Sequence, residues 1–417
     1  MASASRKHFD GLVAQVVEHA TRSACRDCIR AIQGLRELQG VHCPEIDWVD
    51  EWPTEKKLEA KAGPIARKLV SLSPERRRLY IDASDSTRSR PVVEALLEEA
   101  KSHLSTDSDL AVEIAELARQ IVDSIDPERY HEALWFELRS RVLVGLANAL
   151  RRTGDLRAAA HAIARAELAL LLSTENPGVV ALVARVKARV LRDQGAFSDA
   201  LSWINDAIGL YQANRFAQEL GIALYERSKV LASLERYQES VADHHSALLY
   251  IDLKEAPRLG FVVLHSMALR YTALGRMSQA LHALEESVRV GSHAMNEGDW
   301  IRVAWARGRI HVAQDDLVAA EVEFADARDR FVASGHPLDA ALVSLEFAIV
   351  LAERGQFEEV AALASEMHAV FRAAGVPREA RAAAHLLREA TTVEAVRRVA
   401  ATVSRLKSSG PSSASDH

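Results

Sequence analysis

The residues best suited to chemistry lie in the first forty-five positions, where Cys25 and Cys28 form a Cys-x-x-Cys pair. Two thiolates at this spacing can share one tetrahedral zinc ion. His19 precedes the pair, and either His42 or Cys43 could complete the site. The alternative is two reduced thiols on one face of a helix. The sequence therefore offers His19, Cys25, Cys28 and Cys43 as a candidate metal set, and zinc as its only candidate cofactor.

A second cluster, Asp243-His244-His245, could suggest catalysis. Three consecutive residues of a helix point in different directions and cannot all face one site. The sequence contains no phosphate-binding glycine pattern, no Gly-x-Ser-x-Gly motif and no His-Glu-x-x-His motif. We therefore expect no enzymatic activity.

Composition excludes several other classes. The 417 residues are 48% apolar and 26% charged, with a net charge of −6, so bulk attraction to nucleic acid or to a membrane surface is not expected. No segment approaches the apolar length of a membrane span, and the first twenty residues lack a signal peptide's apolar run. Three cysteines, an odd number, indicate a reducing compartment. A cytoplasmic protein is the expectation.

The elements that must position any site repeat at intervals of about forty residues through the last two-thirds of the chain. The repeat has a turn marker, a large apolar residue two positions later, and small residues seven positions before and five positions after the marker, with Val360 the exception at the last position. The six markers are Gly154, Gly195, Glu235, Gly275, Asp315 and Gly355.

Each repeat is predicted to hold two helices, for example residues 220–235 and 237–251. The small positions let the two helices approach closely. Proline follows at intervals of forty or eighty residues, where it can occupy the first turn of the next helix. These prolines are Pro177, Pro257, Pro337 and Pro377.

The pattern of small residue, turn glycine, aromatic residue, two alanines and proline resembles the tetratricopeptide repeat, in a long form of about forty residues. The resemblance implies an all-α fold, an α-solenoid of helix hairpins. We expect a helical N-terminal region over 1–90 and the solenoid over 91–390, with six clear units and a degenerate one at 92–125. A capping helix over 391–407 and a disordered tail over 408–417 would follow.

In this family the first helix of each unit lines a concave groove that binds a partner. Transferred by position, the groove residues are Asn148, Arg151, Arg152, Arg185, Arg189, Arg192, Tyr225, Lys229, His265, Arg302, Trp305 and Arg309. Arginine pairs with carboxylates and aromatic side chains anchor peptides, so the residues favour an acidic, partly hydrophobic protein segment. Two alternatives stay open: solvated helix faces with no ligand, or a nucleic acid or nucleotide bound by the arginines.

The run from His19 to Cys28 and the helix predicted after it resemble a zinc-binding anti-sigma element, although five residues separate histidine and cysteine here instead of three. This resemblance implies a transcription regulator as the partner. The leading hypothesis is a scaffold, adaptor or regulator that binds a protein.

Overall fold

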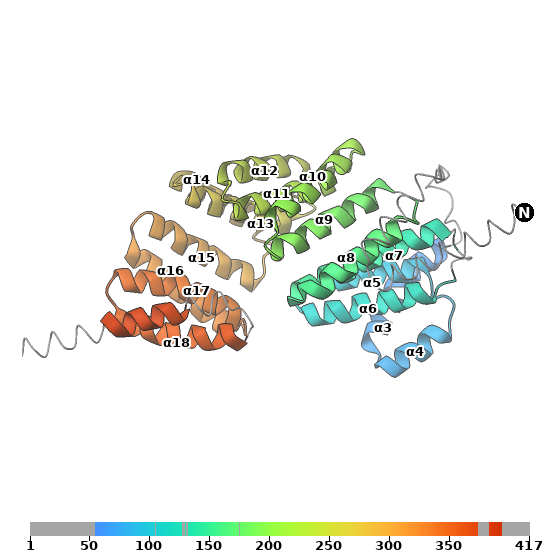
Figure 1. Ribbon diagram of the computed structural model, residues 1–417, viewed down its shortest axis with the longest axis horizontal. Helices are drawn as coiled ribbons and strands as arrows, with labels where there is room; N and C mark the ends of the chain where they lie inside the picture. Colours follow the sequence, from blue (N-terminus) through green and yellow to red (C-terminus); the bar gives the residue numbers. More distant parts are fainter. Residues whose placement is uncertain are drawn as a thin grey trace, which may run out of the picture. The chain divides into compact units, whose positions relative to one another are not determined.

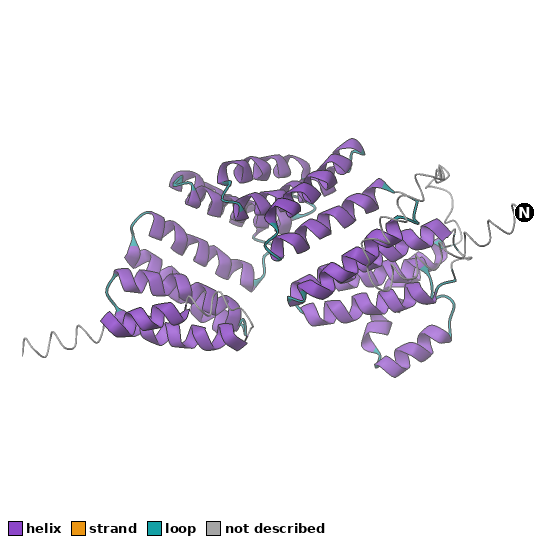
Figure 2. Ribbon diagram, viewed as in Figure 1, coloured by secondary structure: helices purple, strands orange, loops and turns teal. Residues whose placement is uncertain are grey.

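The computed structural model describes residues 55–104, 106–126, 130, 132–174, 176–373 and 383–393. Within these ranges the regular structure is helical and contains no strand (Figure 2), which confirms the all-α prediction. His19, Cys25, Cys28 and Cys43 lie outside the described residues, as do Pro377, the tail and most of the predicted capping helix. In the part of the chain that is described, no three histidine, cysteine, aspartate or glutamate side chains are grouped to hold a metal.

The chain divides into two compact units, Met1–Glu235 and Arg236–His417. The helices of the first unit are α3 (Lys56–Ser71), α4 (Pro74–Asp82), α5 (Arg90–His103), α6 (Ser108–Ser124), α7 (Glu132–Thr153), α8 (Leu156–Leu170), α9 (Pro177–Asp193), α10 (Phe197–Ala213) and α11 (Ala217–Ser233) (Figure 1).

The helices of the second unit are α12 (Tyr237–Tyr250), α13 (Pro257–Ala273), α14 (Met277–Gly291), α15 (Glu297–Ala313), α16 (Leu317–Ala333), α17 (Pro337–Glu353) and α18 (Phe357–Ala373). The two predicted helices of each repeat are present. We call the first of each pair the A helix (α7, α9, α11, α13, α15, α17) and the second the B helix (α8, α10, α12, α14, α16, α18).

All six turn markers adopt the left-handed conformation, with φ between +59° and +87°. At Gly195 and Gly355 the residue after the marker donates its N–H back into the helix. Ala196, after Gly195, donates to the Leu191 carbonyl at 2.9 Å, and Gln356, after Gly355, donates to the Leu351 carbonyl at 2.8 Å. This bond ends an α-helix and satisfies one of its last carbonyls. Glycine is favoured because it has no Cβ to clash, yet Glu235 and Asp315 adopt the same conformation.

Proline and capping side chains begin the helices. Pro177, Pro257 and Pro337 occupy the first turns of α9, α13 and α17, as predicted. Asp155 and Asp316 accept backbone N–H bonds at the starts of α8 and α16. Proline has no N–H to lose there, and an N-cap carboxylate satisfies a donor that the helix leaves free.

Within each of the two units, the small positions lie where an A helix crosses its B helix. Ala147, Ala188, Ala268 and Ala348 are buried in the A helices, and Ala159, Ala200, Ala280 and Ala320 are buried in the B helices. The helices approach closely at Gly308 on α15, where a Cβ would lie 2.5 Å from Cε1 of Phe324 on α16. Small side chains therefore set the spacing within each hairpin.

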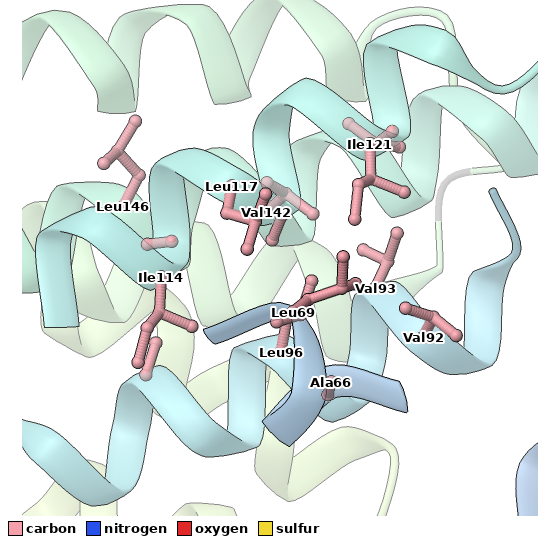
Figure 3. Close-up of a cluster of buried hydrophobic side chains, with 14 of the residues drawn as sticks. Ala66, Leu69, Val92, Val93, Leu96, Ile114, Leu117, Ile121, Val142 and Leu146 are labelled. Atoms are coloured by element: carbon pink, nitrogen blue, oxygen red, sulfur yellow. The ribbon is translucent and has the colours of Figure 1, made fainter. Parts of the chain in front are cut away.

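The largest cluster of buried apolar side chains in the first unit joins α3, α5, α6 and α7 (Figure 3). Leu69, Val93, Leu96, Ile114 and Val142 are all almost fully buried in it. Burying each such side chain stabilises the fold by about 1.5–3 kcal/mol. Helices on both sides of residue 90 therefore share one core, and α5 and α6 pack as a hairpin at the position of the degenerate repeat.

None of the helices found in the described ranges is long and apolar enough to cross a membrane.

Candidate functional site

The A helices of successive repeats pack against one another, α7 against α9 and α9 against α11 in the first unit. This contact brings residues about forty positions apart into register. Five cationic side chains come together here, and we call them the inner cationic cluster: Arg151, Arg185, Arg189, Arg192 and Lys229. All five are among the residues that the repeat pattern predicted for the groove.

Glu226 on α11 lies at the centre of this cluster. Its carboxylate is 3.4 Å from Nζ of Lys229, 3.6 Å from a terminal nitrogen of Arg192 and 3.7 Å from Nε of Arg189. Only 7% of the Glu226 side chain is exposed. A buried carboxylate requires compensating positive charge, and here three cations from two helices provide it.

Asp193, the last residue of α9, lies at the opposite end of the cluster. It pairs with Arg151 at 2.5 Å and with Arg192 at 2.6 Å. Asn148 on α7 accepts a second hydrogen bond from Arg151 at 3.3 Å. Arg151 is only 8% exposed, so these contacts fix its guanidinium in place. Asn148 and Arg151 therefore position Asp193 and Arg192 and offer little surface themselves.

The charges in this region do not balance. Among the described residues, five cations share two carboxylates, Asp193 and Glu226. Burial opposes ionisation of Glu226, but Lys229 and the arginines outweigh it and hold the Glu226 pKa well below its usual range. Burial, together with the neighbouring arginines, lowers the pKa of Arg189 to about 10 despite Glu226. Arg189 remains charged at neutral pH, so the cluster keeps an excess of positive charge.

Two donors in the cluster lack acceptors. The Nε atoms of Arg185 and Arg189 are buried, and neither has a hydrogen-bond acceptor among the described groups. Arg185 lies beside the Tyr211 hydroxyl, whose pKa is raised by burial and lowered in part by this arginine. An unsatisfied buried donor costs about 1–3 kcal/mol, so an acceptor supplied by a ligand would be favoured at this position.

The aromatic residue predicted for this part of the groove is not exposed. Tyr225 is only 6% exposed, and Nζ of Lys229 lies 4.2 Å from the centre of its ring. Tyr225 therefore supports Lys229 and presents almost no ring face. Arg152, on the other side of α7, donates from Nε to the Leu104 carbonyl at 3.0 Å. It points toward the α5–α6 turn and does not join the cluster.

The predicted residues of the second unit are paired with acids. Arg302 lies 3.2 Å from Asp299, and Arg309 donates from Nε to Glu346 at 2.7 Å and from a terminal nitrogen to the other oxygen. The guanidinium of Arg309 also covers the ring of Trp305, 4.6 Å from its centre. The arginines on this surface are therefore neutralised by neighbouring side chains.

His265 on α13 bonds through Nε2 to the Arg302 carbonyl of α15 at 3.1 Å. Its ring packs against Phe261, with 5.5 Å between ring centres. Burial lowers the pKa of His265 to about 4, although the carbonyl partially offsets this effect. His265 is therefore neutral at physiological pH and connects two A helices.

The acids at the centre of these contacts, Glu226, Asp193 and Glu346, were not among the predicted residues. Glu226 and Glu346 could have been found from the number of positions that separate contacting residues of neighbouring A helices. Arg309 bonds to Glu346 across 37 positions, and His265 bonds to Arg302 across 37. The same offset from Arg189 leads to Glu226. These three pairs thus join neighbouring A helices about one helical turn short of the repeat period.

The histidines of Asp243-His244-His245 have separate environments. His244 is fully buried and bonds through Nδ1 to the Ser240 carbonyl at 2.6 Å. His245 bonds through Nε2 to the Tyr271 hydroxyl at 2.9 Å. The two imidazoles are directed to different partners, as expected for adjacent residues of one helix.

Comparisons with known proteins identify the fold. No family model and no curated protein matches the chain. Among solved structures, a Rap protein complexed with Competence and Sporulation Factor aligns with a TM-score of 0.56 and 14% identity, over 88% of this chain and 99% of that one. The apo quorum sensor NprR from B. thuringiensis aligns with a TM-score of 0.48 and 12% identity, over 81% of this chain and 99% of that one.

A Rap conjugation gene regulator of the plasmid pLS20, in complex with the Phr* peptide, aligns with a TM-score of 0.49 and 12% identity, over 93% of this chain and 96% of that one. None of these comparisons supports the resemblance of residues 19–28 to an anti-sigma element. The chain is similar to TPR-like helical-repeat proteins, and its fold is the predicted all-α solenoid of helix hairpins.

Proposed function

We propose that this protein is a non-enzymatic adaptor or regulator of the cytoplasm, whose inner cationic cluster binds an acidic, partly hydrophobic segment of a protein partner. The observation that carries the proposal is the charge imbalance between the A helices of the first unit. Five cations share Asp193 and Glu226, and two buried guanidinium nitrogens lack acceptors.

A carboxylate fits these requirements. Arginine donates in a planar fork that matches the two oxygens of a carboxylate, and hydrogen bonds to charged groups are stronger than neutral ones. Arg185 and Arg189 are one helical turn apart on α9, so a single acidic side chain can approach both. Glu226 lies 3.7 Å from Nε of Arg189 and attracts this guanidinium without a hydrogen bond, so Nε stays available as a donor.

The similarity to the Rap structure supports a binding role for the fold. That protein was solved with Competence and Sporulation Factor bound, and this chain aligns with almost all of it. We transfer the general role of binding another molecule and not the identity of that molecule.

The nucleic-acid alternative is less well supported. Single-stranded nucleic acid is bound by stacking its bases on exposed aromatic rings. Tyr225 is buried, and the Trp305 ring is covered by Arg309 and packs against Phe331, 6.3 Å between centres. The net charge of −6 also disfavours a polyanion. A protein segment, with few charges and some apolar surface, agrees better with these observations.

The test is a binding measurement with defined peptides. Fluorescein-labelled peptides that alternate glutamate and leucine are titrated with the full chain, beside matched peptides with glutamine in place of glutamate and a labelled thymidine oligonucleotide. We expect the acidic peptide to bind most tightly. The double variant Arg185→Gln/Arg189→Gln should weaken that binding by about tenfold or more.

The control is Arg289→Gln, which removes an exposed arginine of α14 whose ion pair, among the described residues, is with Glu286 in the same helix. It should bind the acidic peptide as the unmodified chain does. Equal affinity for the glutamate and glutamine peptides, or tighter binding of the oligonucleotide, would contradict the proposal.

A further inference from the structure

A second site lies between the two helices of the first repeat, α7 and α8, and the preceding helix α6. A pocket of about 520 Å³ opens between α6, α7 and α8. Its volume is within the range of small-molecule sites. It is built from Leu143, Leu146 and Leu150 of α7 on the apolar side and from Arg119, Arg157 and Arg165 on the polar side. It shares no residue with the inner cationic cluster.

The apolar side of the pocket is rigid. Leu143 and Leu146 are buried members of two different hydrophobic clusters of the first unit, and Leu150 packs against both clusters. The pocket therefore lies where two parts of the core meet on α7. A ligand there would contact aliphatic carbon held in place by close packing, as in preformed ligand sites.

The polar side contains more positive charge than its own acids neutralise. Glu116 accepts from Arg119 at 2.9 Å, and Arg119 also donates to Asp123 at 2.8 Å. Asp155 is used as the N-cap of α8, where it accepts from the Ala158 N–H at 2.9 Å. Both acids that line the pocket thus already have partners.

Arg165 on α8 is half-buried at this position, and no carboxylate of the described residues forms an ion pair with it. Burial, Arg139 and Arg119 all lower the pKa of Arg165, and Asp123 and Glu116 offset this only in part. Arg157, about two helical turns before Arg165 on α8, also lines the pocket, is exposed, and likewise lacks an ion-pair partner among the described groups. A half-buried guanidinium that neighbours other cations is stabilised by an anion.

We propose that this pocket binds a small amphipathic anion, with its carboxylate or phosphate group at Arg165 and its apolar part against Leu146 and Leu150. The anionic group would supply the charge that Arg165 lacks, and the leucines would remove the apolar part from water. The site is independent of the proposed partner surface, because the inner cationic cluster lies on α7, α9 and α11 and contributes no residue to the pocket.

The experiment is calorimetric titration of the full chain with four probes: octanoate, octyl phosphate, octanol and inorganic phosphate. Octanoate and octyl phosphate should bind at least about tenfold more tightly than octanol, which lacks the charge, and than inorganic phosphate, which lacks the apolar part. The tighter of the first two probes identifies the head group. Equal affinity for octanol, or no binding by either amphipathic anion, would overturn the proposal.

The decisive variant is Arg165→Gln, which removes the charge and leaves a shorter polar side chain. It should lower the affinity for the tighter anion by about tenfold or more and leave the melting temperature unchanged or higher, since an unpaired half-buried charge is lost. Arg157→Gln, at an exposed position, supplies a second test that does not disturb packing and should weaken binding less. Unchanged affinity in Arg165→Gln would refute the site.

Two controls separate this site from the partner surface. Arg185→Gln/Arg189→Gln should bind octanoate as the unmodified chain does, and Arg165→Gln should keep its affinity for the acidic peptide. If the peptide fails to bind while octanoate binding depends on Arg165, the proposed function is wrong and the pocket stands. If the acidic peptide binds as expected while octanoate does not bind or binds independently of Arg165, the proposed function stands and the pocket proposal is wrong.

Discussion

The α-carbon of Gly308 faces the ring of Phe324 so closely that a β-carbon there would stand 2.5 Å from Cε1 and 2.6 Å from Cδ1. Phe324 is fully buried and belongs to the core shared by α15, α16 and α17. The glycine therefore makes room for an aromatic side chain at this crossing. The substitution Gly308→Ala tests how rigid that crossing is.

We expect Gly308→Ala to lower the free energy of unfolding by about 1–3 kcal/mol, because the Phe324 ring must move within a packed core. The gain of about 0.5–1 kcal/mol from replacing a mid-helix glycine is smaller. Gly209 in α10 is the matched control, because a β-carbon there meets nothing within 4 Å. Gly209→Ala should stabilise the protein in the same urea denaturation experiment. Stabilisation by both changes would contradict the close contact.

Substitutions at Gly195 test backbone strain without a change in packing. Its φ is +82°, and a β-carbon would have open space around it. Gly195→Ala should still destabilise the protein by about 1 kcal/mol, because an L residue is strained in this region. Gly195→Asn should cost less, since asparagine tolerates the left-handed conformation. Thermal melts of the two variants are the measurement, and an alanine variant as stable as the asparagine variant would argue against this explanation.

Removing the charge of Glu226 should be costly and dependent on pH. At pH 7, Glu226→Gln leaves the inner cationic cluster with Asp193 as its only acid and should lower the free energy of unfolding by about 3–5 kcal/mol. The pKa of Glu226 is depressed in the folded state from its ordinary value of 4.5. Its contribution is therefore full above that value and declines as the pH falls below it, because protonation in the unfolded chain becomes favourable.

The difference in stability between Glu226→Gln and the unmodified chain should accordingly shrink when urea denaturation is repeated at pH 4 and below. Glu286→Gln is the control, because Glu286 is partly exposed and its ion pair among the described residues is with Arg289, in the same helix. It should leave stability nearly unchanged at both pH values. A Glu226→Gln variant as stable as Glu286→Gln at pH 7 would show that the cluster does not need its central acid.

Burial of His265 should make the free energy of unfolding depend on pH in a higher range than Glu226 does. Its pKa in the folded protein is about 4, below the ordinary 6.5, so the unfolded chain takes up the proton first as the pH falls. The contribution of neutral His265 is full above pH 6.5 and decreases by about 1.4 kcal/mol per pH unit between 6.5 and 4. NMR titration of the imidazole should give a midpoint near 4. In His265→Phe, stability should depend less on pH across this interval, and a midpoint near 6.5 would disprove the assignment.

The repeat pattern predicted the helices and turns because both depend on short-range chemistry. Glu235 and Asp315 were identified as turn markers although neither is glycine, and both adopt positive φ. The 40-residue spacing places them, since a turn of one fixed geometry must recur for each hairpin to pack on the next. The N-terminal start of α13 at Pro257 followed from the same reasoning.

The electrostatic partners could not be obtained in this way. The repeat pattern places Arg189 on a face of its helix, but Glu226 reaches it only because neighbouring A helices are offset by about one turn. Tyr225 lies on the same predicted face and is nevertheless buried beneath Lys229. Burial at a helix contact depends on the angle and offset between two helices, which the spacing within one helix does not contain.

The equal turns at Gly275 and Asp315 have a consequence for how this protein can change in length. Each ends an A helix with the same backbone conformation and precedes a B helix two residues later. Removing residues 276–315 would join Gly275 to Asp316 and place α16 directly after α13, with Ala268 and Ala320 at the new crossing. The shortened chain would need no new turn, but Ala268 would replace Gly308 against Phe324, so the Phe324 ring would have to move at the new crossing. Loss of one whole hairpin therefore preserves the turn geometry, whereas an insertion of a few residues would shift the turn relative to both helices.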